Sequence, residues 1–237
     1  MDWNSYARFD KLFLKLFLDE QEPTLRILLD ASGSMRHGEP DKWALALKLA
    51  AALAYLSLSR YDRVVVAPLS AGRAVVSRTF SGRQAFPEVE AFLEAVAPAG
   101  ETALDASAAQ VPAGRGRGIC ILLSDLLTES DWRRGVKSLL FRRQEVALLH
   151  ILSPEELSPE LTGAVRLTDA EGAPPLEIHL TPDALRRYQE TLSAFLHAAE
   201  SFCAGLSIPY VRLSSEADFE REALRALMAA GMVAGRG

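Results

Sequence analysis

The chain has 237 residues, of which 49% are hydrophobic and 24% are charged, and its net charge is −5. A chain of this length can bury a sizeable core, and its acidic balance gives no reason to expect a nucleic-acid partner. No segment approaches the roughly 20 consecutive apolar residues of a membrane helix. The start, "MDWNSYARFD", lacks the basic and apolar regions of a signal peptide.

The cysteines and histidines argue against a disulfide-rich domain and against a zinc site. Two cysteines are too few for a disulfide scaffold, and the four scattered histidines lack the spacing of a zinc site. Cys120 lies in the apolar run "GICILL" and Cys203 in a helical pattern, so both are predicted to be buried free thiols. We therefore expect a cytoplasmic protein.

Apolar runs and helical patterns alternate along the first two-thirds of the chain. Short apolar or β-branched runs predict strands at 24–30, 62–70, 73–80, 116–125 and 145–152, the second and third of which would form a hairpin. Longer patterns predict helices at 41–60, at 84–97, from about Thr102, and at 129–143. This alternation predicts an α/β fold with a mostly parallel sheet and helices on both faces.

The two ends of the chain add further predicted elements. These are an edge strand at 10–20, an antiparallel hairpin at 164–180, a long amphipathic helix at 181–206, a strand at 208–214 and a helix at 216–231. Since the sequence shows no linker or repeat, residues 1–237 are predicted to form a single domain. The hairpin and long helix within 153–206 would be an addition to it.

Oxygen-bearing side chains follow the predicted strands at the points where those strands end. Asp30, Ser32 and Ser34 come at the end of the first buried strand, in "LRILLDASGSM". Asp125 ends another in "LLSDLL", and Thr102 lies in the loop "PAGETALD". Because ligands bind beyond the carboxyl ends of parallel strands, we expect these side chains to lie close together. Carboxylates and hydroxyls suit a hard divalent cation such as Mg²⁺.

The serine loop has the spacing of a ligand pair. Ser32 and Ser34, two residues apart on a tight loop, can turn both hydroxyls the same way, and Gly33 relieves crowding between them. With several neutral ligands the ion would keep positive charge and an open position, and would recruit an acidic side chain from a partner. The same composition is common in turns and helix caps, so a plain turn is the alternative.

Three motifs carry a resemblance to a known site. "DASGSM", followed downstream by "GETAL" and "LLSDLL", is similar to the metal-ion-dependent adhesion site of von Willebrand factor type A domains. More narrowly, the chain resembles the bacterial domain-of-unknown-function family fifty-eight, whose genes often neighbour a MoxR-type AAA+ ATPase. Four segments carry that resemblance: "DWNSYARFDKLFLKLFLDE", "ILLDASGSM", "KLAAALAYLSLSRYDRVVVAPLS" and "YQETLSAFLHAAESFCAGLSIPYVRLSSEADFEREALRAL".

The resemblance implies a three-layer α/β/α domain of the von Willebrand factor A, Rossmann-like type. It implies that Ser32, Ser34 and Thr102 bind Mg²⁺ directly, with Mn²⁺ or Ca²⁺ as alternatives, while Asp30 and Asp125 lie nearby or act through water. The implied role is a protein–protein interaction module, in which a partner's acid completes the metal shell. That partner would be a MoxR-type ATPase, with the chain as its adaptor in complex assembly or metal-cofactor insertion.

Two positions depart from the pattern of such domains. Leu126 follows Asp125 where glycine is frequent, and Glu101 stands where a second glycine is common. The residues expected at the periphery of the site are Gly33, His37 and Glu101. Family members usually have a segment before the aspartate and tryptophan that begin this chain as Asp2 and Trp3, and longer ones carry membrane helices there. Membrane association through such a segment is therefore the alternative to a free cytoplasmic protein.

An enzyme is the other class of hypothesis. A Mg²⁺-dependent phosphotransferase or hydrolase would use Asp30 as its nucleophile and a second acid two residues on to protonate the leaving group. That position is Ser32, which cannot do so near neutral pH. The sequence also has no G-x-S-x-G elbow and no phosphate-binding P-loop. We therefore expect no enzymatic activity, and a structural scaffold with a vestigial metal site is the remaining alternative.

Overall fold

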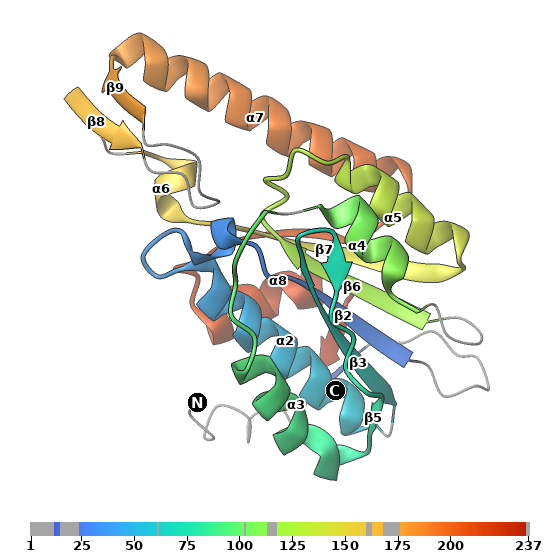
Figure 1. The fold of residues 1–237 in the computed structure, drawn as a ribbon. Helices are drawn as coiled ribbons and strands as arrows, with labels where there is room; N and C mark the ends of the chain where they lie inside the picture. Colours follow the sequence, from blue (N-terminus) through green and yellow to red (C-terminus); the bar gives the residue numbers. More distant parts are fainter. Residues whose placement is uncertain are drawn as a thin grey trace.

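The computed structural model describes residues 12–14, 24–60, 62–101, 103–112, 118–159, 163–167 and 176–235. Its main sheet has seven strands in the order β10–β7–β6–β2–β3–β4, with β5 also pairing with β3 (Figure 1). The strands are β2 Thr24–Asp30, β3 Arg63–Ser70, β4 Arg73–Ala74, β5 Phe80–Ser81, β6 Gly118–Ser124, β7 Gln144–Leu152 and β10 Tyr210–Ser214. Only β4 and β5 run antiparallel to their neighbour, so the described sheet is mostly parallel, as predicted.

The central strands are apolar because both of their faces are covered. β2 lies between β3 and β6, and all of its residues except Thr24 are buried. Near-continuous apolar sequence is the pattern of a parallel strand packed on both sides. In the register of β2 and β6, Leu29 lies opposite Leu123. The chain therefore leaves the carboxyl ends of the two strands side by side, at Asp30 and at Asp125.

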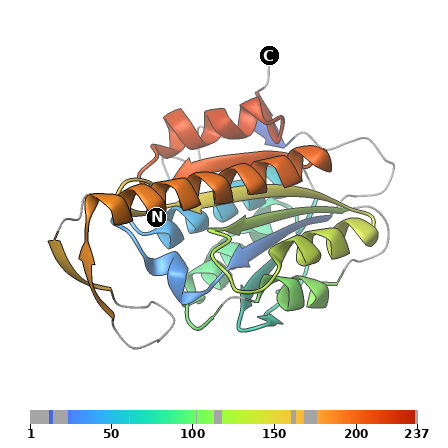
Figure 2. The ribbon, with the colours of Figure 1, turned by 90° about the horizontal axis from the view of Figure 1, so that it is seen from above.

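Helices cover both faces of the sheet (Figure 2). They are α2 Lys42–Leu58, α3 Phe86–Glu94, α4 Leu104–Gln110, α5 Trp132–Phe141, α6 Pro154–Leu157, α7 Pro182–Gly205 and α8 Leu224–Ala229, the last preceded by a π-helical turn at Phe219–Ala223. Leu29 packs with α2, α3 and α8 in one core cluster, and Leu28 packs with α4, α5 and α7 in the other. Adjacent strand residues point to opposite faces, which produces the expected three-layer α/β/α architecture.

The strand predicted at 73–80 is only partly right. β4 and β5 pair with β3 near its two ends, and the chain between them is not a strand. There the Ser77 hydroxyl accepts the N–H of Val66 at 2.9 Å and donates to the carbonyl of Arg78 at 2.8 Å. A side chain thus takes the place of one backbone ladder bond, and this interrupts the strand.

The N-terminal strand differs from its prediction. Leu12–Leu14 forms β1, but it pairs antiparallel with β11 (Val233–Gly235) in a two-stranded sheet of its own. It is therefore not an edge strand of the main sheet. The rest of 10–20 lies outside the described residues.

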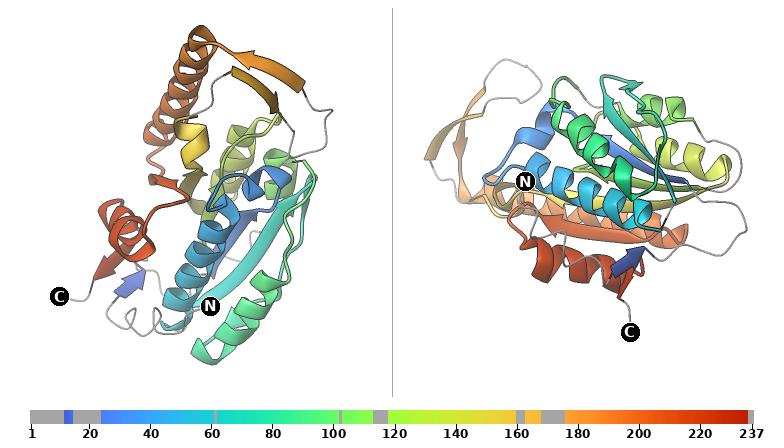
Figure 3. Two further views of the ribbon diagram at one scale, coloured as in Figure 1. Left: turned by 90° about the vertical axis from the view of Figure 1, so that its left-hand side faces the viewer. Right: turned by 90° about the horizontal axis from the view of Figure 1, so that it is seen from below.

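The last third of the chain adds an extension. β8 (Gly163–Leu167) and β9 (Leu176–Leu180) form the predicted antiparallel hairpin, which leads into α7. With 24 residues, α7 is about 36 Å long. Its buried residues are Leu196, Ala199 and Cys203, all in its second half. The first half of α7 and the hairpin project beyond the rest of the molecule (Figure 3).

Two further sequence expectations concern the environment of the protein. Cys120 and Cys203 are both free and buried, as predicted. None of the helices in the described ranges is long and apolar enough to span a bilayer.

Candidate metal centre

Asp30 ends β2 with its side chain completely buried. Its Oδ1 accepts the backbone N–H of Ser32 at 3.1 Å, and its Oδ2 accepts the hydroxyl of Ser124 at 2.5 Å. Ser124 is the last residue of β6, and its hydroxyl in turn accepts the N–H of Leu126 at 2.9 Å. The carboxylate of Asp30 is therefore fixed between the ends of two neighbouring strands.

The loop after Asp30 presents two hydroxyls. It contains a short 3₁₀ turn over Gly33–Arg36, with Ser32 buried and Ser34 partly exposed. The two serine Oγ atoms lie 3.0 Å apart, so both hydroxyls turn to the same side. Ser34 gives this pair access to the surface.

The loop before α4 lies beside the serine loop. The N–H of Gly33 donates to the carbonyl of Gly100 at 2.9 Å. Glu101, the next residue, is exposed, and so is His37. Thr102, the predicted third hydroxyl ligand, lies outside the described residues, and its part in the site stays a prediction.

Asp125 has a partner that the sequence did not predict. Lys42, the first residue of α2, is completely buried, and its Nζ lies 2.6 Å from Oδ2 of Asp125. The same ammonium binds Oε1 of Glu156, while Oδ1 of Asp125 accepts the N–H of Leu127 at 3.0 Å. Burial removes the water around the lysine, and the positive end of the α2 dipole opposes its charge. The two carboxylates compensate for both.

Leu126 has the backbone conformation that suits glycine. Its φ is 58°, in the left-handed region, where a side chain costs roughly 1–2 kcal/mol and glycine almost nothing. The N–H bond to Ser124 holds the turn, and the leucine side chain is buried in the core beside α4 and α5. Packing thus offsets the strain at the position where the sequence departs from the usual glycine.

A buried histidine holds the backbone of Asp125. Nε2 of His150 lies 2.9 Å from the Asp125 carbonyl, and its Nδ1 lies 2.7 Å from the hydroxyl of Tyr210. A carbonyl can only accept, so Nε2 carries the proton and Nδ1 accepts from Tyr210. Burial lowers the pKa of His150 to about 4, which keeps the ring neutral.

The electrostatics at Asp30 favour a nearby positive charge. Burial raises the pKa of Asp30 to about 7, and the charge of Asp125 adds to the rise, while the hydrogen bonds from Ser124 and Ser32 oppose it. A carboxylate in this setting is stabilised by any cation placed close to it.

The oxygen set fits a small divalent cation. Neighbouring ligands in an octahedral Mg²⁺ shell, with bonds of about 2.0–2.1 Å, lie roughly 2.9 Å apart. The hydroxyls of Ser32 and Ser34 are 3.0 Å apart, and Asp30 supplies negative charge beside them. Among the described residues no three His, Cys, Asp or Glu side chains gather as a metal cluster. Ser32, Ser34 and Asp30 are the described residues that would hold a cation here.

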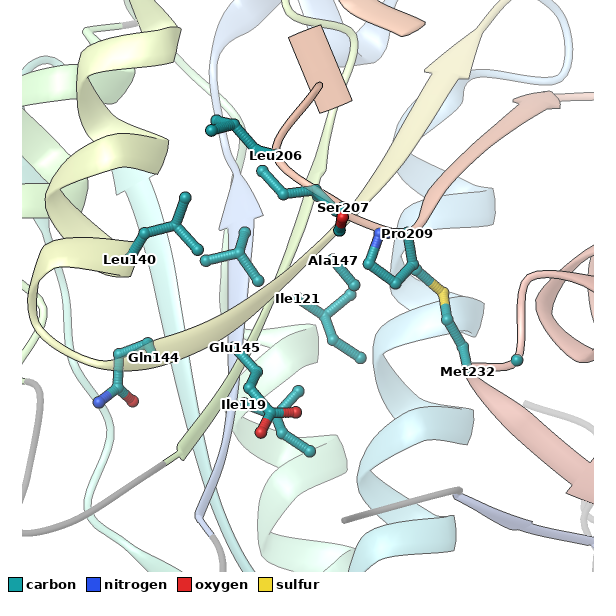
Figure 4. A pocket seen from close by; sticks show the side chains of 13 residues that line it. Ile119, Ile121, Leu140, Gln144, Glu145, Ala147, Leu206, Ser207, Pro209 and Met232 are labelled. Atoms are coloured by element: carbon teal, nitrogen blue, oxygen red, sulfur yellow. The ribbon is translucent and has the colours of Figure 1, made fainter. Parts of the chain in front are cut away.

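A separate hollow lies at the other end of the sheet (Figure 4). It has a volume of about 410 Å³ and is lined by the amino ends of β6 and β7, the loop before β10 and the turn after α8. Ile119, Leu140, Ala147 and Met232 make most of its wall apolar, and Glu145 is its acidic residue. Open parallel sheets bind ligands at their carboxyl ends, where the hydroxyls and carboxylates converge.

The sequence also matches a described family over most of its length. The model of the family described as "Protein of unknown function DUF58" matches residues 1–197. The chain belongs to the DUF58 family. An uncharacterized protein of Mycobacterium tuberculosis is 26% identical to this DUF58 chain over 237 residues, which cover 95% of the chain and 73% of that protein.

Two solved structures share the fold of this DUF58 chain. The conserved hypothetical protein BatB of Bacteroides thetaiotaomicron has a TM-score of 0.53 and 16% identity, covering 89% of this chain and 98% of BatB. An aerotolerance-related membrane protein of Bacteroides fragilis has a TM-score of 0.52 and 17% identity, covering 88% and 98%. The likeness concerns the fold alone, a mostly parallel sheet with helices on both faces.

The DUF58 fold brings Asp30, Ser32, Ser34 and Asp125 together at the carboxyl ends of β2 and β6. Sequence reasoning missed the residues that surround them: Lys42 and Ser124 bond the carboxylates, His150 bonds the backbone of Asp125, and Glu156 bonds Lys42. One of them carries a local signal, since "SPEE" at 153–156 has the Ser-x-x-Glu spacing of a capping box, and that box is present at the start of α6.

Proposed function

We propose that this DUF58 domain is a divalent-cation-dependent protein–protein interaction module. The observation that carries the proposal is the hydroxyl pair of Ser32 and Ser34, 3.0 Å apart beside the buried carboxylate of Asp30. Mg²⁺ is the expected ion, with Mn²⁺ and Ca²⁺ as alternatives. Thr102 is the third expected hydroxyl ligand, and Asp125 is expected to act through water.

An aspartate or glutamate of a partner protein would complete the metal shell. Hydroxyl ligands are neutral, so Mg²⁺ keeps positive charge and attracts an anionic ligand to its open position. The proposed partner is a MoxR-type AAA+ ATPase, on the family resemblance. The domain would be its adaptor in complex assembly or cofactor insertion, in the cytoplasm or attached to the membrane through a further segment.

Two observations bear on the alternatives. Asp30 is completely buried, and its oxygens accept hydrogen bonds from Ser124 and Ser32. This suits a held carboxylate better than a nucleophile for phosphoryl transfer. The Lys42 ammonium neutralises Asp125, and this favours the second candidate function, a structural scaffold whose metal site is vestigial.

Calorimetric titration with Mg²⁺ and Mn²⁺, with and without acetate as a carboxylate probe, tests the cation site. The wild type should bind, and Ser32→Ala/Thr102→Ala should lose binding while its circular dichroism spectrum is unchanged. Ser130→Ala is the matched control, because its hydroxyl lies 2.9 Å from that of Thr128, a similar pair outside the proposed ligand set. If the wild type does not bind even with acetate, the scaffold function is favoured.

The partner needs a test of its own. Binding to a purified MoxR-type ATPase from the same organism should be measured by surface plasmon resonance in Mg²⁺ and again in EDTA. Binding that EDTA and Ser32→Ala both abolish supports the adaptor role. Binding of equal strength in EDTA would contradict a cation-dependent interaction.

A further inference from the structure

Lys42 forms an ion pair with one of the two buried aspartates at the carboxyl ends of the central strands. Asp30 ends β2, Asp125 directly follows the end of the neighbouring β6, and both are completely buried. The Lys42 ammonium lies 2.6 Å from Asp125, whereas Asp30 accepts hydrogen bonds from the hydroxyl of Ser124 and the N–H of Ser32. One acid thus forms an ion pair with a lysine, and the other accepts hydrogen bonds from the ends of both strands.

Asp125 is held at three points. Lys42 binds its Oδ2, the N–H of Leu127 binds its Oδ1 at 3.0 Å, and Nε2 of His150 binds its carbonyl at 2.9 Å. Lys42 is itself fixed, since it begins α2, is completely buried and also binds Glu156 at the start of α6. For Asp125 to coordinate an ion directly, its carboxylate would have to leave a buried ammonium uncompensated, which is costly.

We propose that Lys42 is a positioning residue that keeps Asp125 out of the inner shell of the cation. The bound ion then depends on a carboxylate from the partner. This inference rests on the proposed function. With Asp125 held on Lys42, the ion keeps a net positive charge, which the partner's acid neutralises. Direct coordination by Asp125 would add a negative charge to the ion from the chain itself and would weaken the demand for a partner's acid.

Lys42→Met tests this role, because methionine keeps an unbranched stem and a high helix propensity but carries no charge. In calorimetric titration the variant should bind Mg²⁺ at least about tenfold more tightly than the wild type, since affinity rises with the number of charged ligands. Acetate should raise the Mg²⁺ affinity of the wild type and have no such effect on the variant. Lys48→Met is the matched control: Lys48 is exposed on the same helix, and its variant should behave as the wild type.

A double variant separates the charge effect from a folding effect. Lys42→Met/Asp125→Asn removes both members of the pair, so its Mg²⁺ affinity should return to that of the wild type. If Lys42→Met is less stable without cation, Mg²⁺ should raise its thermal midpoint far more than that of the wild type. The double variant should lack this added rise.

The outcomes distinguish a failure of the role of Lys42 from a failure of the proposed function. Equal or weaker Mg²⁺ binding by folded Lys42→Met, while the wild type binds, would overturn the role of Lys42 and leave the cation site intact. Absence of Mg²⁺ binding in the wild type would instead remove the proposed function.

Discussion

Asp30, the last residue of β2, and Asp125, which directly follows β6, are both buried at the carboxyl ends of neighbouring strands but have different partners. Asp30 is bonded to Ser124 and Ser32, and its pKa is raised to about 7, whereas Asp125 is bonded to the Lys42 ammonium. Equal burial therefore does not give two acids equal chemistry. The groups bonded to each carboxylate, and not its burial alone, decide its part in the fold.

Breaking the Asp125 pair should have the largest effect. Asp125→Asn leaves Lys42 buried with Glu156 as its remaining carboxylate, and we expect a loss of about 3 kcal/mol in the free energy of unfolding. Urea denaturation followed by circular dichroism at pH 7 measures it. Asp131→Asn, at the exposed N-cap of α5, should cost under about 1 kcal/mol. Equal losses in the two variants would contradict the importance of the buried pair.

The histidine that holds Asp125 should make stability depend on pH. The pKa of His150 is about 4 in the folded protein and about 6.5 when unfolded. Between these values only the unfolded state binds the proton, so stability is lost as the pH falls from 6.5 toward 4. From pH 7 to pH 5 the wild type should lose about 2 kcal/mol more than His150→Gln.

Urea denaturation at both pH values gives this difference. His197→Gln is the control, because His197 is exposed on α7, and it should follow the wild type. Identical pH profiles for the wild type and His150→Gln would show that the histidine is not held neutral.

Removing the hydroxyl that holds Asp30 should have a smaller effect. Ser124→Ala removes a donor to Asp30 and leaves the N–H of Leu126 without that acceptor. We expect a loss of about 1–2 kcal/mol, measured in the same way. Ser201→Ala, on the exposed side of α7, should change stability by less than about 0.5 kcal/mol. A loss no greater than that of the control would mean that the Ser124 contacts are not needed.

The pH dependence that Asp30 contributes should have the opposite sign to that of His150. An unfolded aspartate titrates near 3.9, whereas Asp30 titrates at about 7 in the folded protein. Between these values only the folded state binds the proton, so the stability present at low pH is lost as the pH rises to 7. In EDTA, the stability of Asp30→Asn relative to the wild type should therefore rise from pH 4 to pH 8, and the variant should be the more stable of the two at pH 8. Thermal unfolding at the two pH values measures it, and a wild type that is the more stable at pH 8 would contradict this assignment.

Much of the fold follows from hydrophobic patterning. The buried runs that end on Asp30 and Asp125 are parallel strands, and their order places both acids at one edge. Which strands pair with each other is harder to predict from hydrophobic patterning. Nothing in "RAVVSRTF" marks Ser77 as a residue whose side chain replaces a backbone bond, and nothing in "LFL" at 12–14 indicates that its partner is near the C-terminus.

The candidate site, like the fold, could be predicted from the sequence only in part. Asp30, Ser32 and Ser34 were predicted from local sequence because they share one loop. Lys42 was not, because a lysine in the first turn of a helix is normally exposed, and its partners come from two distant segments, at Asp125 and Glu156. That ammonium is buried because the layers of the fold pack around it, and the local sequence around Lys42 does not show this.

The interruption at Ser77 also affects how the molecule behaves beside its own copies. Val75 and Val76 are exposed on the outermost segment of the sheet, and exposed β-branched residues on an intact edge strand favour pairing with another chain. Because the segment between β4 and β5 is not a strand, it does not offer a continuous row of backbone donors and acceptors. The break at this edge therefore opposes edge-to-edge aggregation.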